Sequence, residues 1–220
     1  MLYRLSYRGA VVPSTFLGDA KHQAMHVDVG EPLSVEQLFT GIRSAFSEPL
    51  SFVIHCAGIL RWAPLSQCTD ELFDEIIKIE LKGTFLVNRA AIRDMLQSGK
   101  PLSDWRGAIV NVSSLAARCG PVQPCAYAAA KAGVVALTKS AASEVAKHGI
   151  RCNVVVPGWV DTPMMAEFVE SNKAIVISNT PLKRTGQPME IAEAIKFLCS
   201  PRTSSFITGT VLEVTGGFKM

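Results

Sequence analysis

The chain has 220 residues, of which 48% are hydrophobic and 19% are charged, a composition typical of one α/β domain with a substantial core. Its formal net charge of +3 is too small to indicate nucleic acid or a membrane surface as a partner. No apolar run reaches the roughly 18 residues that a membrane-spanning helix needs.

The six cysteines form no CxxC motif and no cluster with histidine, so the sequence predicts neither a metal site nor a disulfide framework. They indicate free thiols in a protein of a reducing compartment. The cysteines are Cys56, Cys68, Cys119, Cys125, Cys152 and Cys199.

The N-terminal part of the chain gives no clear pattern up to residue 23. Residues 9–12 could form a short strand that Pro13 limits. The residues before Asp19 include Arg4 and Arg8 and no acidic residue, which is compatible with a mitochondrial targeting segment and equally with an ordinary N-terminal piece. Residues 24–29 are then predicted to form a strand.

A helix and a strand follow. Ser34 and Gln37 have the spacing of a capping box, so we expect a helix to begin at Ser34. Residues 51–55 indicate a buried strand, and small residues come directly after it. The expected inner stripe of the helix is Val35, Leu38, Phe39, Ile42 and Phe46.

A long helical region is predicted from about residue 69 to residue 97, before a polar loop at 97–106. Its expected core side is formed by Leu72, Phe73, Ile76 and Ile77.

The middle of the chain carries the strongest signal. Residues 108–112 form an apolar run typical of a buried parallel strand, and Ser114 follows it. Residues 126–147 predict a long helix that carries Tyr127 and Lys131. Because residues four positions apart share one helical face, we expect the Lys131 ammonium to lie near the Tyr127 phenol.

These residue types fit proton transfer. A free tyrosine has a pKa of about 10, which is too high for acid–base work near neutral pH. An ammonium about 4 Å away favours the phenolate by at most about 3 pKa units, so we expect Lys131 to lower the pKa of Tyr127. Tyr-x-x-x-Lys alone also arises by chance, and the strand, the serine and the helix are what favour the functional interpretation.

Further elements complete the predicted α/β fold. Residues 151–156 indicate another buried strand, which ends at Pro157 and Gly158. Residues 163–187 are expected to form a mobile substrate lid. Pro188 suits the first turn of a helix, and residues 210–214 form the last predicted strand. The expected inner face of the helix is Ile191, Ala194, Ile195 and Leu198.

With its serine, Tyr-x-x-x-Lys pattern and central strand, the chain resembles the short-chain dehydrogenase/reductase family from about residue 20 to its end. Residues 81–85, 148–153, 207–210 and 213–217 make it similar to the branch that contains the type 8 17β-hydroxysteroid dehydrogenases and the 3-oxoacyl-[acyl-carrier-protein] reductases. The resemblance implies a Rossmann-like, doubly wound parallel sheet and hydride transfer between NAD, or NADP, and a carbonyl or alcohol.

The resemblance also implies site residues. Ser114 polarises the substrate carbonyl, Tyr127 passes the proton, and Lys131 lowers the tyrosine pKa and holds the nicotinamide ribose. Asp28 contacts the adenine, unless it only caps a turn. The cofactor-binding residues implied in addition to Tyr127 and Lys131 are Val27, Asp28, Val29, Ala57, Gly58, Val160, Asp161 and Thr162.

Three features depart from the family pattern. His55 and Cys56 replace two asparagines, and we interpret His55 as structural. Glu80 stands where relatives have an asparagine that holds a water of the proton relay, and its charge near Lys131 should alter the tuning of the tyrosine. No Gly-x-x-x-Gly-x-Gly turn for the pyrophosphate precedes Asp28.

We therefore expect residues 1–220 to form one short-chain dehydrogenase/reductase domain, truncated at its N-terminal end so that the first strand and the glycine loop are missing. Two functions stay open: an enzyme that acts on 3-oxoacyl thioesters or 17β-hydroxysteroids, and an impaired subunit that supports a partner reductase. The resemblance implies the mitochondrial matrix, with the cytoplasm as the alternative. It also implies a homo- or hetero-tetramer, possibly with a carbonyl reductase type 4-like subunit.

Overall fold

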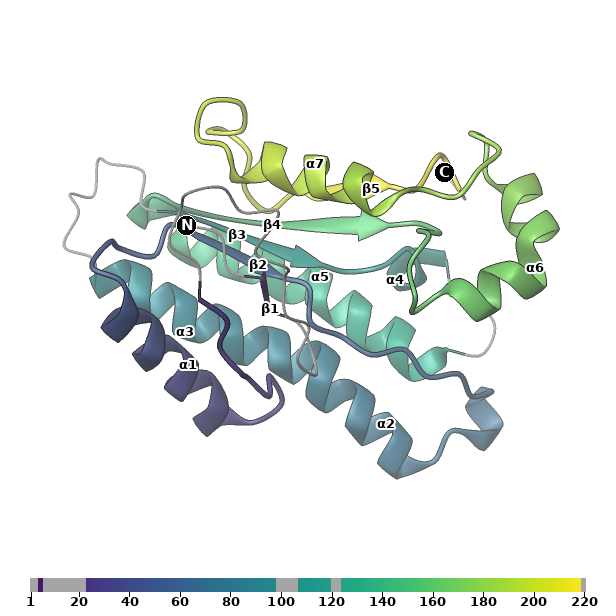
Figure 1. The fold of residues 1–220 in the computed structure, drawn as a ribbon, viewed down its shortest axis with the longest axis horizontal. Coiled ribbons are helices and arrows are strands. Elements are labelled where there is room, and N and C mark those ends of the chain that lie inside the picture. Colours follow the sequence, from purple (N-terminus) through teal and green to yellow (C-terminus); the bar gives the residue numbers. More distant parts are fainter. Residues whose placement is uncertain (1–3, 6–22, 98–106, 120–123, 219–220) are drawn as a thin grey trace.

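The computed structural model describes residues 4–5, 23–97, 107–119 and 124–218 (Figure 1). Its centre is a parallel sheet in which five strands lie in chain order. No helix in the described part of the chain is long and apolar enough to cross a membrane. The strands are β1 (Arg4–Leu5), β2 (Phe52–His55), β3 (Gly107–Val112), β4 (Ile150–Pro157) and β5 (Val211–Val214).

Helices cover both faces of the sheet. In Figure 1, α1, α2, α3 and α5 lie along one face, α7 lies along the other, and α6 lies beyond one end of the strands. The helices are α1 (Pro32–Ala45), α2 (Asp70–Ile76), α3 (Gly83–Gln97), α4 (Ala116–Cys119), α5 (Cys125–Val145), α6 (Ala166–Asn179) and α7 (Pro188–Cys199), with shorter helical segments η2 (Leu65–Gln67), η3 (Ile77–Lys82) and η4 (Ala146–His148).

The predicted α/β class and the parallel sheet are confirmed. The expected strands at 51–55, 108–112, 151–156 and 210–214 correspond to β2 to β5 within one or two residues. Alternate residues of β2 enter separate cores: Val53 packs with the α1 and α3 side, whereas Ile54 packs with α7. All five residues of the predicted stripe on α1 are buried.

The predicted strand at residues 24–29 is wrong. Residues 23–28 have no regular secondary structure and a turn follows at Val29 and Gly30. The edge of β2 is instead paired with β1, in register Leu5 with His55. Because an isolated extended segment satisfies no ladder hydrogen bonds, an apolar run without a neighbouring strand does not become a strand. Residues 9–12, the other possible short strand, lie outside the described residues.

Three smaller predictions also need correction. Helix α1 begins at Pro32 rather than at Ser34, and the Ser34 hydroxyl accepts the backbone N–H of Asp28 at 2.9 Å. Phe73 is 43% exposed, so it is not on the core side of α2. The segment 163–187, expected to be a lid without a clear pattern, contains helix α6. Its role as a lid stays a prediction.

The last helix is anchored by a buried arginine. The Arg151 guanidinium on β4 donates hydrogen bonds to the carbonyls of Leu198 at 2.8 Å, Cys199 at 3.1 Å and Ile207 at 3.3 Å. Two of these carbonyls belong to the last turn of α7, where helix carbonyls lack internal partners. The arginine therefore binds the negative end of the helix to the sheet.

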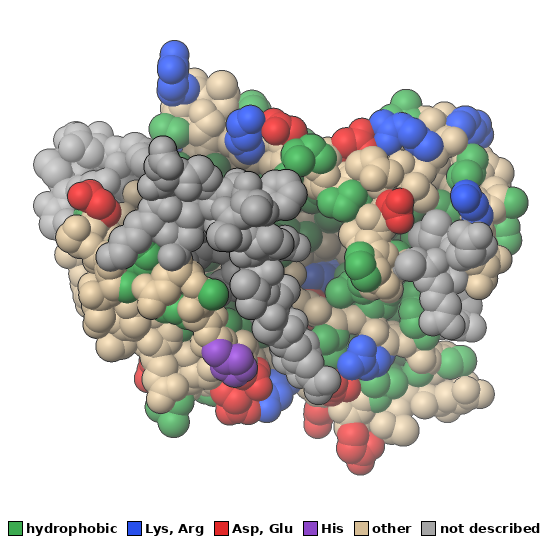
Figure 2. Space-filling model, in the orientation of Figure 1, with side chains coloured by type: hydrophobic (Ala, Val, Ile, Leu, Met, Phe, Trp, Pro, Cys, Tyr) green, Lys and Arg blue, Asp and Glu red, His purple; other side chains and the backbone are tan. Residues whose placement is uncertain are grey.

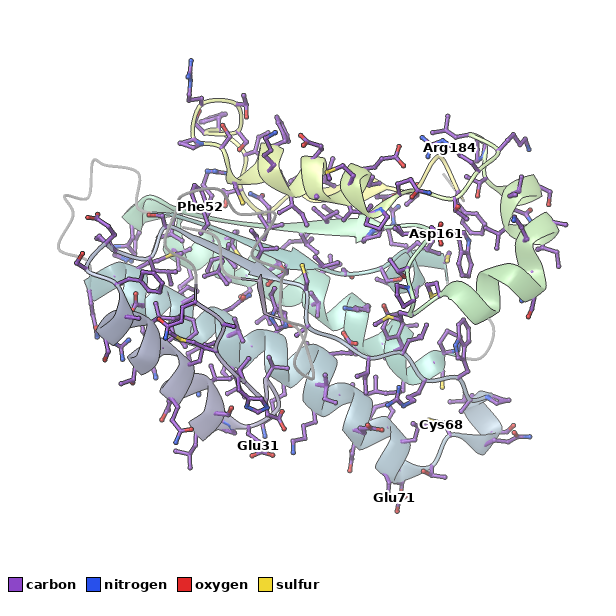
Figure 3. The ribbon with its side chains drawn as sticks, in the orientation of Figure 1. Glu31, Phe52, Cys68, Glu71, Asp161 and Arg184 are labelled. Atoms are coloured by element: carbon purple, nitrogen blue, oxygen red, sulfur yellow. The ribbon has the colours of Figure 1, made fainter. Side chains whose placement is uncertain are left out.

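All six cysteines are free thiols, as expected. A contact that the sequence did not predict joins Cys68, just before α2, to Cys125 at the start of α5: their side chains are hydrogen bonded. Figure 3 labels Cys68 in the lower layer of helices.

Candidate active site

Ser114, Tyr127 and Lys131 meet beyond the carboxyl end of β3. Ser114 is the second residue after the strand, and the other two residues lie on α5, which packs on the sheet. The neighbouring Ser113 donates its hydroxyl to the Lys131 carbonyl at 2.8 Å, and this bond fixes the first turns of α5 against β3. The carboxyl ends of parallel strands are where open α/β sheets bind their ligands.

Lys131 is held from three sides. Its side chain is almost fully buried, and its Nζ donates to the Val112 carbonyl at 2.9 Å. The same atom lies 5.5 Å from the centroid of the Tyr127 ring. It also lies 2.7 Å from Oε2 of Glu80, which forms an ion pair with it. The predicted proximity of Lys131 and Tyr127 is thus confirmed, and Glu80 joins them.

Glu80 comes from an irregular part of its helix. Residues Ile77–Lys82 form a π-helical segment between α2 and α3, and this is the interruption in the long helix predicted at 69–97. Such segments are frequent at functional sites. The second carboxylate oxygen, Oε1, accepts the backbone N–H of Ile59 at 2.5 Å, so both oxygens of Glu80 have partners.

The pKa of Tyr127 is raised, not lowered as the sequence led us to expect. Burial has the largest effect and favours the neutral phenol. The Lys131 charge acts in the predicted direction, but the Glu80 charge opposes it, and a hydrogen bond with Ser114 lowers the pKa only in part. The expected direction was wrong because the burial of the phenol outweighs the effect of the Lys131 ammonium.

The pKa of Lys131 is raised as well. Burial works against the ammonium, but the Glu80 carboxylate, and then Tyr127, favour it more strongly. Lys131 is therefore charged at neutral pH, as the family resemblance requires of it.

His55 lies at the end of β2, in register with Asn111 of β3. Its ring is 2% exposed, and neither ring nitrogen has a hydrogen-bond partner. Burial and then the Lys131 charge lower the pKa of His55 to about 3, so the ring is neutral. No pattern in the sequence indicated that this histidine lies near the charge of Lys131.

The residues that the resemblance implied for cofactor binding differ in the groups that they can offer a ligand. The Asp28 carboxylate accepts the N–H of Gly30 at 2.9 Å, which is the turn-capping alternative. The buried side chains among these residues leave only their backbone for a ligand; they are Val27, Val29, Ala57 and Val160. Gly58 serves Glu80, because an added Cβ would lie 2.6 Å from Oε1.

The segment after β4 lies at the same end of the sheet. Asp161 is exposed and Thr162 is partly exposed, and the Asp161 N–H donates to the Gly186 carbonyl at 2.9 Å. Figure 3 places Asp161 and Arg184 together at this end of the molecule. Figure 2 shows a hollow near the centre of this view, with apolar side chains along its right-hand side.

Known proteins with similar sequences and structures cover most of the chain. Residues 11–219 match the family described as "Enoyl-(Acyl carrier protein) reductase". The chain is 40% identical over 200 residues to a (3R)-3-hydroxyacyl-CoA dehydrogenase of Mus musculus, covering 91% of this chain and 75% of that protein. It is 34% identical over 215 residues to a 3-oxoacyl-[acyl-carrier-protein] reductase of Escherichia coli, covering 98% and 84%. A crystal structure of a short-chain type dehydrogenase/reductase from Mycobacterium marinum superimposes with a TM-score of 0.81 at 29% identity, covering 89% and 74%.

Proposed function

Because the chain belongs to the short-chain dehydrogenase/reductase family, we propose that it is an NAD(P)-dependent oxidoreductase that interconverts a carbonyl and an alcohol. The observation that carries the proposal is the meeting of Ser114, Tyr127 and Lys131 beyond the end of β3. A hydroxyl donor, a phenol and an ammonium are the groups needed to polarise an oxygen and to move a proton.

The residues act as follows. The Ser114 hydroxyl oxygen accepts the N–H of Ala116 at 3.2 Å, so its own O–H is free to rotate toward Tyr127 or a substrate oxygen. In reduction the Tyr127 phenol gives its proton to the substrate oxygen, and in oxidation the phenolate takes the proton from the alcohol. Lys131 keeps the charge that favours the phenolate.

The described residues fit the nicotinamide–ribose part of the cofactor. Lys131 has three N–H donors, and Val112 and Glu80 occupy two of them, so a third is available for a ribose hydroxyl. Asp161 and Thr162 would line the neighbouring end of β4. When bound, the cofactor supplies or accepts the hydride. We propose NAD, with NADP as the alternative that a direct comparison tests.

The proposed substrate is a 3-oxoacyl or 3-hydroxyacyl thioester. The names of the mouse and Escherichia coli relatives describe the two ends of one such reaction, and this supports the thioester over a steroid. The test measures NADH consumption with an acetoacetyl thioester beside oxidation of estradiol. We expect thioester turnover that Tyr127→Phe reduces by about 100-fold or more, since one positioned proton-transfer group is worth that much. Equal activity in Tyr127→Phe would refute the assignment.

A specific observation favours a second candidate, a non-catalytic subunit that supports a partner reductase. The Glu80 charge opposes Lys131, and the pKa of Tyr127 is raised. Calorimetric titration with NADH separates the two candidates. Micromolar affinity supports the enzyme, whereas binding at least about 100-fold weaker, a loss of about 2.7 kcal/mol, supports the subunit.

Location and assembly complete the proposal. We propose the mitochondrial matrix, with the cytoplasm as the alternative, and a fluorescent fusion distinguishes the two compartments. We also propose a tetramer, either of this chain or with a carbonyl reductase type 4-like subunit. Exposed aromatic rings at Phe73 on α2 and Phe85 on α3 support an association surface on that side of the sheet, and light scattering measures the assembly.

A further inference from the structure

The most unusual group in the site is the Glu80 carboxylate. It is 1% exposed, and three residues surround it closely. The Ile59 N–H binds one oxygen at 2.5 Å and the Lys131 ammonium binds the other at 2.7 Å. Gly58 leaves room, because a Cβ there would lie 2.6 Å from the first oxygen and 3.0 Å from the second. A buried charge is tolerated when it is paired and hydrogen bonded in this way.

The charges around Lys131 come from several elements. Glu80 from η3 is the carboxylate paired with the ammonium, and Tyr127 lies on the same helix as Lys131. From β2 and the residue after it, His55 is neutral and Cys56 is an exposed thiol that also interacts with Lys131. The paired carboxylate and ammonium carry no net charge, so Tyr127 experiences a positive charge that is largely cancelled.

We propose that Glu80 is a positioning residue that fixes the Lys131 ammonium and cancels its charge, so that Tyr127 stays a protonated phenol up to a higher pH than an uncharged residue at position 80 would allow. This inference rests on the proposed function and deepens it. The protonated phenol is the form that gives its proton to a substrate oxygen during reduction. The phenolate, which takes the proton from an alcohol, forms only at higher pH. Glu80 therefore extends to higher pH the range over which Tyr127 can protonate a substrate oxygen.

The first test needs no catalysis. The chain contains three tyrosines, Tyr3, Tyr7 and Tyr127, so carbon NMR of ring-labelled tyrosine follows each phenol as the pH is raised, and Tyr127→Phe identifies the signal. We expect the titration midpoint of Tyr127 to fall by about one to two pH units in Glu80→Gln, which keeps the shape and removes the charge. Glu75→Gln is the matched control, since Glu75 is a surface carboxylate on the neighbouring α2. It should leave the midpoint unchanged.

A double variant keeps the inference testable if Glu80→Gln folds poorly. Lys131→Met with Glu80→Gln removes both charges and leaves no buried ion alone. If the two charges cancel at Tyr127, its midpoint in the double variant stays within about one pH unit of the wild type. A shift of several units, or no shift in a folded Glu80→Gln, would overturn the role assigned to Glu80.

The second test uses activity. As the pH is raised, kcat/KM for thioester reduction should begin to fall at a pH about one to two units lower in Glu80→Gln than in the wild type or in Glu75→Gln. An active wild type whose profile does not move in Glu80→Gln would refute the inference and leave the proposed function intact. A wild type without activity on any carbonyl would refute the proposed function, while the tyrosine titration still decides the role of Glu80.

Discussion

Two buried cations, Lys131 and Arg151, are each about 6% exposed, yet they are stabilised in different ways. Arg151, on the α7 side of the sheet, is surrounded by backbone carbonyls. Lys131, on the α5 side, is paired with the Glu80 carboxylate. Carbonyl dipoles solvate a charge without cancelling it, whereas a carboxylate cancels it. Replacing the partner side chain can therefore change the charge beside Lys131, whereas the carbonyls that bind Arg151 are backbone groups that a substitution does not remove.

The largest expected effect is the loss of the site cation. Lys131→Met should lower the free energy of unfolding by about 3–5 kcal/mol, because it leaves the Glu80 carboxylate buried without its partner. Chemical denaturation at neutral pH measures this loss. The double variant with Glu80→Gln should recover more than half of it, and a double variant as unstable as Lys131→Met would contradict the pairing.

The loss of Arg151, which anchors α7 to the sheet, should have a different consequence. Arg151→Met leaves the carbonyls of Leu198, Cys199 and Ile207 without their donor, and we expect a loss of about 3 kcal/mol. Because Arg151 and Glu80 lie on opposite faces of the sheet, Glu80→Gln should add its own effect to this loss and rescue nothing. Rescue of Arg151→Met by Glu80→Gln would break the distinction between the two cations.

The close fit between Gly58 and the Glu80 carboxylate can be tested by a substitution at Gly58. Gly58→Ala places a methyl group 2.6 Å from Oε1 of Glu80, and we expect a loss of about 1–3 kcal/mol from overpacking. Gly186→Ala is the control, since its nearest neighbour would be 3.6 Å away, and it should stay within about 0.5 kcal/mol of the wild type. Equal losses in the two variants would show that Gly58 has no special fit to Glu80.

A pH dependence of stability is also expected on the Lys131 side of the sheet. The pKa of His55 is about 3 in the folded chain and about 6.5 in an unfolded one. Between these values the unfolded state binds the extra proton. The contribution of neutral His55 to the free energy of unfolding is therefore fully present above about pH 6.5. Below that pH it falls by up to about 1.4 kcal/mol per pH unit.

Denaturation at several pH values measures this slope. His55→Gln should flatten it, whereas His26→Gln, at an exposed histidine, should leave it unchanged. In Lys131→Met the pKa of His55 should rise toward its ordinary value, because a nearby positive charge has been removed. The pH range over which stability falls should therefore become narrower. A slope that survives His55→Gln would assign it to other groups.

The sequence predicted best those features that depend on neighbouring residues in the chain. Ser114, Tyr127 and Lys131 could be found because a buried parallel strand is a continuous apolar run and because helix spacing fixes which residues share a face. The strand expected at 24–29 failed because a strand needs a partner, and the edge of β2 is taken by β1.

The electrostatics of the site could be predicted only in part. The sequence showed that the Glu80 charge would act near Lys131. It could not show that the Ile59 N–H binds the carboxylate or that Gly58 leaves space for it. The direction of the Tyr127 pKa was wrong because the burial of a side chain is a property of the whole fold. His55 gave no signal, since its distance from Lys131 depends on how β2 and α5 pack.

The π-helical segment Ile77–Lys82 has one further consequence. A π turn accommodates one more residue than the α-helical turn that it replaces, so a single-codon insertion or deletion interconverts the two. Removing one residue ahead of Glu80 would rotate its side chain by about 100° around the helix axis, away from the ammonium. The net charge beside Tyr127 therefore depends on the number of residues in this helix as well as on its side chains. A one-residue deletion ahead of Glu80 would alter that charge without changing Ser114, Tyr127 or Lys131.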